Sequence, residues 1–226
     1  MCVKIGGVQK FSLLDFPDKI SAIIFTAGCN FHCGYCHNPE LFSSQSEWDE
    51  KKVLEFLKSR EGKLDGVVVT GGEPTIHKDL PEFIRKIKSL GFLVKLDTNG
   101  TNSLMLKSLI DLKMVDYVAM DIKGPLYKYK MITGIEPAGV EESINILLKN
   151  NIPYEFRTTA LALQLDIKDF EEIGKLISGA DKYFVQKFVP SKILNPKLLA
   201  DRGYTNAEIN SIISVLHKYI KSVGIR

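Results

Sequence analysis

The chain has 226 residues, of which 45% are hydrophobic and 25% charged, and a formal net charge of +3. These values are ordinary for a soluble globular protein with room for one substantial core, and the small charge argues against nucleic acid or an anionic membrane as a partner. No apolar run approaches the ~18 residues of a membrane span, and no secretory signal pattern is present.

Short apolar runs alternate along the chain with segments whose apolar residues recur at helical spacing. The first run, Ile20–Phe25, is typical of a buried parallel strand. A capping box at Ser46–Asp49 predicts the start of the first helix. Asp79 is expected to cap the second helix, and Gly91 to follow its end. The other expected strands are Val67–Thr70, Leu93–Asp97, Val115–Ile122, Tyr154–Leu163 and Tyr183–Val189, and the other expected helices are Leu104–Leu112, Val140–Lys149 and those capped by Asp166 and Thr205.

Six strands alternating with helices predict an α/β fold with parallel strands joined by crossovers. Periodicity alone does not separate an open doubly wound sheet from a barrel. In both architectures, polar residues at the carboxyl ends of the strands form the site. Because no repeat or linker interrupts the chain, we expect a single domain over residues 1–226, with 1–19 as an N-terminal extension that leads into the first strand.

Three of the four cysteines lie in one short loop after the first strand, as Cys29-x3-Cys33-x2-Cys36. So short a loop with an odd number of cysteines does not suit disulfides. It suits three thiolates on one face of a four-iron cluster, which leaves one iron open to another ligand. Cysteines clustered as ligands also fit a reducing cytoplasm. The fourth cysteine, Cys2, is interpreted as having no role in this site.

Two simpler interpretations of the loop remain open. Structural zinc usually needs four protein ligands, and His32 or His37 could supply the fourth. The cysteines could also be small residues of the hydrophobic core, although the glycines and asparagines around them are more typical of a loop.

The loop resembles that of the radical S-adenosylmethionine (SAM) enzymes, with an aromatic residue, Tyr35, just before the last cysteine. The longer string Gly28–Leu41 resembles the activating proteins of glycyl-radical enzymes. Together with the opening segment Gly6–Pro17, it is most similar to the activating protein of anaerobic ribonucleoside-triphosphate reductase. The resemblance implies a partial (β/α)6 barrel, open on one side, with outer helices.

The resemblance also implies the cofactors and the site. Cys29, Cys33 and Cys36 would hold a [4Fe-4S] cluster, whose open iron binds the amino and carboxylate groups of SAM. The backbone of the Gly-Gly-Glu turn after the second strand would bind the SAM amino group, and polar residues at later strand ends would line the same pocket. The SAM-binding set that the resemblance implies is Tyr35, Gly71, Gly72, Glu73, Asp97, Asn99, Asp121, Lys123 and Arg157.

Several of these residues also have a purely structural interpretation. The glycines could simply form a tight turn, and Asn99-Gly100 is a common turn dipeptide. Period two places Asp121 and Lys123 on one face of a strand, where they could form an internal ion pair. Arg157 could bind a carboxylate of SAM or of a partner peptide, or face the surface. The resemblance also allows a monovalent cation near Asp97.

The activity that the resemblance implies is reductive cleavage of SAM to a 5′-deoxyadenosyl radical, which abstracts a glycine α-hydrogen from a partner enzyme. The expected partners are a glycyl-radical enzyme, with anaerobic ribonucleoside-triphosphate reductase first, and a one-electron donor such as flavodoxin or ferredoxin. Activation of another glycyl-radical enzyme, of the pyruvate formate-lyase type, is an alternative. Radical chemistry on a small molecule, such as a deazapurine precursor, is another.

Overall fold

The computed structural model describes residues 2–43, 46, 48–149 and 152–226. The chain divides into two compact units, which are described separately. The first unit comprises Met1–Asn30, Glu40–Thr98 and Asn102–Val118, and the second comprises Phe31–Pro39, Asn99–Thr101 and Ala119–Arg226. The single domain expected over residues 1–226 stays a prediction.

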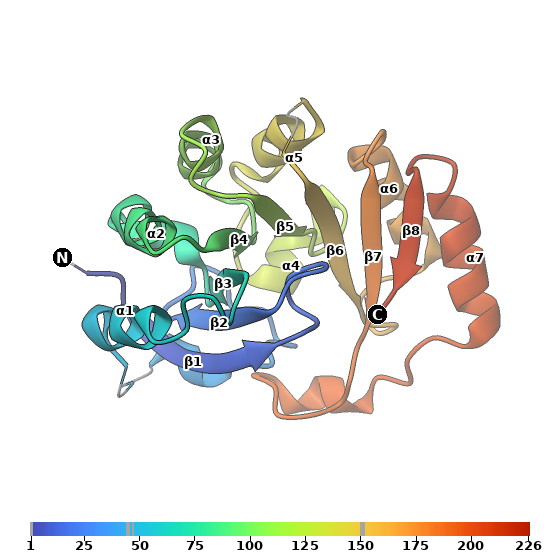
Figure 1. Ribbon diagram of the computed structural model, residues 1–226. Coiled ribbons are helices and arrows are strands. Elements are labelled where there is room, and N and C mark those ends of the chain that lie inside the picture. The colour runs from blue at the N-terminus through green and yellow to red at the C-terminus, as the bar shows by residue number, and fades with distance from the viewer. Residues whose placement is uncertain (1, 44–45, 47, 150–151) are drawn as a thin grey trace. The chain divides into compact units, whose positions relative to one another are not determined.

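Helices and strands alternate through most of the described residues (Figure 1). The strands are β1 (Ile5–Ser12), β2 (Ser21–Thr26), β3 (Gly66–Gly71), β4 (Leu93–Thr98), β5 (Tyr117–Asp121), β6 (Tyr154–Ala160), β7 (Lys182–Lys187) and β8 (Ser222–Ile225). The α-helices are α1 (Glu50–Lys58), α2 (Leu80–Ser89), α3 (Ser103–Asp111), α4 (Tyr129–Thr133), α5 (Val140–Lys149), α6 (Ile167–Leu176) and α7 (Asn206–Leu216).

In the first unit, β2, β3 and β4 are parallel neighbours, and β1 pairs with β2 in the antiparallel direction. Both faces of this sheet are buried at β2 and along most of β3. Ala22 and Ile24 of β2 are fully buried, whereas Ile23 on the opposite face packs with Phe16 and Tyr117. Burial of both faces explains why β2 and β3 are nearly continuous apolar runs rather than alternating ones.

In the second unit, β6, β7 and β8 are parallel neighbours. Helices α6 and α7 pack against each other. Each begins with a capping box, in which the side chain of the N-cap residue and that of the residue three positions later each accept a hydrogen bond from the other's backbone N–H. The caps are Asp166 and Thr205, as the sequence predicts. They satisfy amides at the helix N-termini that have no partner within the helix.

The structure corrects the expected elements at several points. Strands β1 and β8 were not expected; the former lies inside the segment interpreted as an extension. Helix α1 is capped by Asp49, whose side chain accepts from the Lys52 amide, and Ser46 accepts from the Trp48 amide instead of capping the helix. The Glu47 position of the expected capping box lies outside the described residues. Asp79 stands at the N-cap of α2 without a side-chain capping bond.

The expected α/β fold with parallel strands in an open sheet is confirmed. This fold places the expected polar site residues at or near the carboxyl ends of β3, β4 and β5 and within β6. Among the described helices, none has the length and hydrophobicity needed to cross a bilayer.

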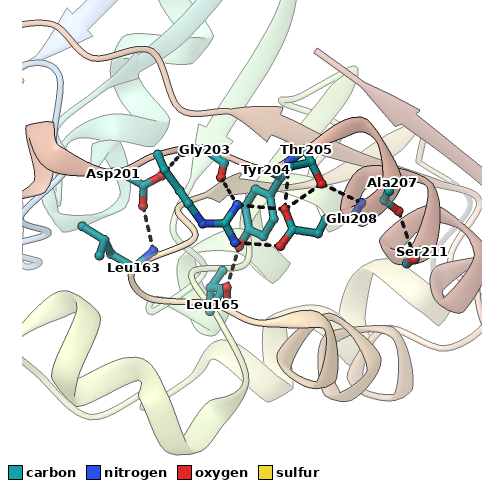
Figure 2. Close-up of polar contacts among 10 residues, drawn as sticks. Leu163, Leu165, Asp201, Gly203, Tyr204, Thr205, Ala207, Glu208 and Ser211 are labelled. Carbon is teal, nitrogen blue, oxygen red and sulfur yellow. Dashed lines mark hydrogen bonds and ion pairs between the residues drawn. The ribbon is translucent and has the colours of Figure 1, made fainter.

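The cap of α7 gives a direct test of local stability. Thr205 Oγ1 accepts from the Glu208 amide at 3.2 Å, and the Glu208 carboxylate accepts from the Thr205 amide at 2.8 Å (Figure 2). Because Thr205→Ala removes the cap acceptor, we expect a loss of about 1 kcal/mol of stability. Thermal unfolding followed by circular dichroism measures it. Thr205→Ser retains the hydroxyl and should unfold close to the wild type; equal melting of all three proteins would contradict the capping role.

Candidate active site

The cysteine loop begins where β2 ends. The Ala27 amide donates to the Lys4 carbonyl and the Gly28 amide to the Leu41 carbonyl, each at 2.8 Å, so the chain is held on both sides just before Cys29. Cys29 belongs to the first unit, whereas Cys33 and Cys36 belong to the second. None of the three forms a disulfide bond with another described residue. The Cys36 amide donates to the Cys33 carbonyl at 3.0 Å, which closes a tight turn between these two residues.

The Gly-Gly-Glu turn of the first unit packs directly on the start of this loop. Gly71 has a φ of +124°, which disfavours any other residue, and a Cβ on Gly72 would overlap the carbonyl oxygen of Gly28. The Glu73 amide donates to that same oxygen at 2.9 Å. Both glycines therefore have a structural reason to be present: they let two backbones approach closely.

The Glu73 side chain is fully buried and acts as a hub of hydrogen bonds. Its Oε1 accepts from the Thr75 amide at 3.1 Å, from Thr75 Oγ1 at 2.5 Å and from Thr98 Oγ1 at 2.7 Å. The carboxylate thus ties the end of β4 to the turn after β3. The amides of Gly72 and Glu73 also have partners, the carbonyls of Thr26 and Gly28, each at 2.9 Å.

Asp97 forms a buried ion pair that the sequence analysis missed. Its Oδ1 lies 2.6 Å from the ammonium nitrogen of Lys95, a side chain only 2% exposed, on the same face of β4. The ammonium group provides a positive charge beside Asp97. The monovalent cation expected there stays a prediction.

Asn99, in the second unit, shapes a turn. Its Oδ1 accepts from the Thr101 amide at 3.0 Å and from Thr101 Oγ1 at 2.7 Å. This arrangement matches the turn interpretation of Asn99-Gly100. In the first unit, Asn102 caps α3 by accepting from the Met105 amide, a role that the sequence analysis did not assign.

The second unit also contains a partly buried charge cluster at the end of β5. Lys123 Nζ lies 3.0 Å from Asp121 Oδ2, so the two side chains lie on one side of the chain as period two predicts, and they form the ion pair of the structural interpretation. Arg157 of β6 donates from Nε to the other oxygen, Asp121 Oδ1, at 2.9 Å. Arg157 is 13% exposed and therefore does not face the surface. One carboxylate thus holds two cations.

This cluster keeps all of its charges at neutral pH. Burial by itself would raise the pKa of Asp121, but Arg157 and Lys123 outweigh it and hold that pKa well below its ordinary value. Burial would lower the pKa of Lys123, but the Asp121 carboxylate holds it well above its ordinary value. The cluster carries two positive charges and one negative charge. The excess of one positive charge suits an anionic group such as a ligand carboxylate.

Two tyrosines surround Lys123. The Lys123 ammonium lies 5.8 Å from the ring centre of Tyr35, and its amide donates to the hydroxyl of Tyr129 at 3.1 Å. Tyr35 is buried, and its hydroxyl has no hydrogen-bond partner among the described residues. Burial also raises the pKa of the neighbouring Cys33 thiol, although the Lys123 ammonium opposes this effect.

The histidines near the loop have structural partners. The His32 amide donates to the Thr133 carbonyl at 2.8 Å, and the His37 ring stacks on Phe188 with centroids 5.7 Å apart. His77, which the sequence analysis left without a role, donates from Nε2 to the Ala27 carbonyl at 3.0 Å. Burial lowers the pKa of both His37 and His77, which favours neutral rings.

The residues fit a cluster and SAM in their chemistry. The motif supplies three cysteines outside any disulfide within eight sequence positions. The Tyr35 hydroxyl, which has no hydrogen-bond partner among the described residues, and the Asp121–Lys123–Arg157 cluster lie in the same unit as two of them. Among the described residues, no three His, Cys, Asp or Glu side chains are arranged to hold a metal ion. The ligand roles of the cysteines and the SAM contacts of the other residues stay predictions.

Comparison with known proteins identifies relatives along the whole chain. A protein of Methanocaldococcus jannaschii, provisionally named a glycyl-radical enzyme activating enzyme, is 34% identical over 98% of this chain and 95% of its own length. The pyruvate formate-lyase-activating enzyme of Clostridium pasteurianum is 28% identical, and the match covers 79% of each chain. The crystal structure of QueE from Escherichia coli shares the fold, with a TM-score of 0.58 and 16% identity over 100% of this chain and 94% of that one.

The sequence pattern of the Radical SAM superfamily matches residues 23–177. These residues include all three cysteines of the motif and the strands β3 to β6. Enzymes of this superfamily use a [4Fe-4S] cluster and SAM, so the two cofactors expected from the sequence are confirmed. The family pattern covers more than half of the chain and a 34% identical relative covers nearly all of it, and this chain is accordingly an enzyme of the radical SAM superfamily.

Proposed function

We propose that this enzyme generates a glycyl radical on a partner protein, and that the partner is anaerobic ribonucleoside-triphosphate reductase. The generation of a glycyl radical is supported by one observation. The chain is similar, over nearly the full length of both proteins, to the M. jannaschii protein that is provisionally named a glycyl-radical enzyme activating enzyme. The second part rests on sequence: the opening segment Gly6–Pro17 and the string Gly28–Leu41 resemble the reductase-activating group.

In this proposal, the thiolates of Cys29, Cys33 and Cys36 hold the cluster. Three protein ligands leave one of its four irons free for SAM. When bound and reduced, the cluster supplies the electron that splits SAM into methionine and a 5′-deoxyadenosyl radical. The contribution of the protein is to orient SAM, to exclude water and to admit the glycine whose α-hydrogen is removed.

The charge cluster of the second unit is the proposed anchor for one end of SAM. Lys123 and Arg157 offer positive charge to the SAM carboxylate, and the Asp121 carboxylate offers an acceptor to its amino group. Tyr35 carries an unpartnered buried hydroxyl that suits a polar group of the ligand, and its ring suits adenine.

The backbone of the Gly-Gly-Glu turn is another proposed contact with SAM. Glu73 uses its side chain to fix the turn, and the Gly72 amide already donates to the Thr26 carbonyl at 2.9 Å. The carbonyls of Gly71 and Gly72 are therefore the proposed acceptors for the SAM amino group. Asp97 and Asn99 also belong to the proposed pocket, although each already has a protein partner. We further propose a cytoplasmic protein that receives its electron from a flavodoxin or a ferredoxin.

A different glycyl-radical enzyme is the second candidate partner. The match to the pyruvate formate-lyase-activating enzyme of C. pasteurianum over 79% of each chain supports it. The chemistry and the site residues would be the same, and the partner alone would differ. Action on a small molecule such as a deazapurine precursor would require no partner protein.

The partner is tested by electron paramagnetic resonance. Protein purified without oxygen, reconstituted with iron and sulfide and reduced with dithionite is mixed with SAM and anaerobic ribonucleoside-triphosphate reductase. We expect the doublet of a glycyl radical on the reductase. Cys33→Ala should abolish the doublet and SAM cleavage, because it removes a cluster ligand. Cys2→Ala is the matched control and should retain both, since Cys2 is exposed and outside the motif.

The outcomes separate the two parts of the proposal. If 5′-deoxyadenosine forms without a doublet on the reductase, but a doublet forms on pyruvate formate-lyase, the activity stands and the partner is wrong. Full SAM cleavage by Cys33→Ala would contradict the cluster assignment.

Gly72→Ala tests the contact between the turn and the cysteine loop. The added methyl group would overlap the Gly28 carbonyl and displace the loop beside Cys29. Since small misplacements in an active site cost about 100-fold in rate, we expect a loss of SAM cleavage of that order. Gly7→Ala is the control, because a Cβ there would meet its nearest atom, Phe25 Cδ2, at an ordinary 4.0 Å. A wild-type rate in Gly72→Ala would show that the close contact does not matter.

A further inference from the structure

Lys95, in strand β4 of the first unit, is a buried lysine that the proposed chemistry does not use. Its side chain is 2% exposed, and it is among the largest fully buried side chains of the described residues. Lysine is almost never fully buried unless its charge is paired, because taking an ammonium group out of water costs free energy. The position of Lys95 is therefore explained by what its ammonium group contacts.

The sheet places the stem of Lys95 beside apolar side chains. In the pairing of β3 with β4, Lys95 lies next to Val68, which is 1% exposed. Leu93, two residues earlier on the same face of β4, packs against the apolar cluster that contains Val68. The aliphatic stem of Lys95 thus continues the apolar layer, and its ammonium group reaches further along the strand, toward the carboxyl end.

At the carboxyl end of β4 the ammonium group meets the Asp97 carboxylate. Lys95 Nζ lies 2.6 Å from Asp97 Oδ1, a short distance that is typical of a hydrogen bond between two charged groups. The Asp97 side chain is 12% exposed, so the carboxylate is more open than the lysine that binds it. The pair therefore presents Asp97 at the strand end and keeps the lysine behind it.

This contact bears on the monovalent cation that the sequence resemblance allows near Asp97. A carboxylate that is largely out of water needs a positive charge beside it, which a metal ion or a lysine can supply. A metal ion on Asp97 Oδ1 would lie close to the Lys95 ammonium group, and two like charges on one oxygen repel each other. The first unit therefore fits one cation on this oxygen, and the chain itself provides that cation.

We propose that Lys95 takes the place of a monovalent metal ion beside Asp97, so that neither folding nor SAM binding needs K⁺ or Na⁺. Lys95 is a positioning residue in this role, because it holds the Asp97 carboxylate in one orientation at the end of β4. Its effect on SAM binding rests on the proposed function, since Asp97 belongs to the proposed pocket. Its effect on stability is independent of that function.

The test variant is Lys95→Met, whose shorter side chain leaves the position of the ammonium nitrogen open to a cation. Reconstituted holoprotein is studied in potassium, ammonium and choline chloride at equal ionic strength. Thermal unfolding is followed by circular dichroism, and SAM binding by isothermal titration calorimetry. The matched control is Lys88→Met. It removes a lysine that pairs with Asp116 at 2.8 Å in the same unit but is 29% exposed, so that water can solvate the remaining carboxylate.

We expect the wild type to melt at one temperature and to bind SAM equally in all three salts. Lys95→Met should melt about 10 °C lower in choline, because it leaves a largely buried carboxylate without its cation. Potassium or ammonium should restore much of this loss and should strengthen SAM binding about tenfold relative to choline. Neither Lys88→Met nor the double variant Lys95→Met with Asp97→Asn should respond to the choice of salt, because the latter has no carboxylate to bind a cation.

A wild type that melts higher or binds SAM more tightly in potassium than in choline would overturn the proposal, since a metal ion would then bind in addition to Lys95. Lys95→Met that is destabilised equally in all three salts would also overturn it and would leave an ion pair with no relation to a cation site. Wild-type holoprotein that cleaves no SAM with dithionite would instead overturn the proposed function, while the melting temperatures would still decide the role of Lys95.

Discussion

A close contact between two backbones helps to fix the start of the cysteine loop. The Gly28 carbonyl, one residue before Cys29, lies against Gly72 with no space for a side chain and accepts the amide of Glu73. The buried Glu73 carboxylate in turn binds the hydroxyls of Thr75 and Thr98. The chain that leads into the motif is therefore fixed by the ends of β3 and β4, and substitutions that add bulk there act on the loop directly.

The second unit meets a different requirement, because it holds three charged side chains partly out of water. Removing Asp121, Lys123 and Arg157 from water costs free energy, and their mutual attraction offsets that cost only where geometry and hydrogen bonds are good. The carboxylate uses both oxygens, one for each cation. The cluster keeps one excess positive charge, which suits the carboxylate of the proposed ligand.

Local sequence patterns correctly predicted the features that depend only on residues close together in the chain. The cap at Asp166, the capping box at Thr205 and the shared face of Asp121 and Lys123 follow from spacings of two or three residues, and all are present. The same period-two argument would have found Lys95 beside Asp97. Contacts between distant segments could not be inferred, because no local pattern encodes them. The bond between His37 and Ser191 joins residues 154 positions apart, and the antiparallel strand β1 became evident only from its pairing with β2.

In the proposed chemistry, three thiolates leave one iron of the cluster open to SAM. Mössbauer spectroscopy of protein reconstituted with ⁵⁷Fe, recorded with and without SAM, distinguishes the irons. We expect one iron of the four to acquire distinct parameters when SAM is added and the other three to keep theirs. Four irons that remain unchanged by SAM, although SAM is bound, would contradict it.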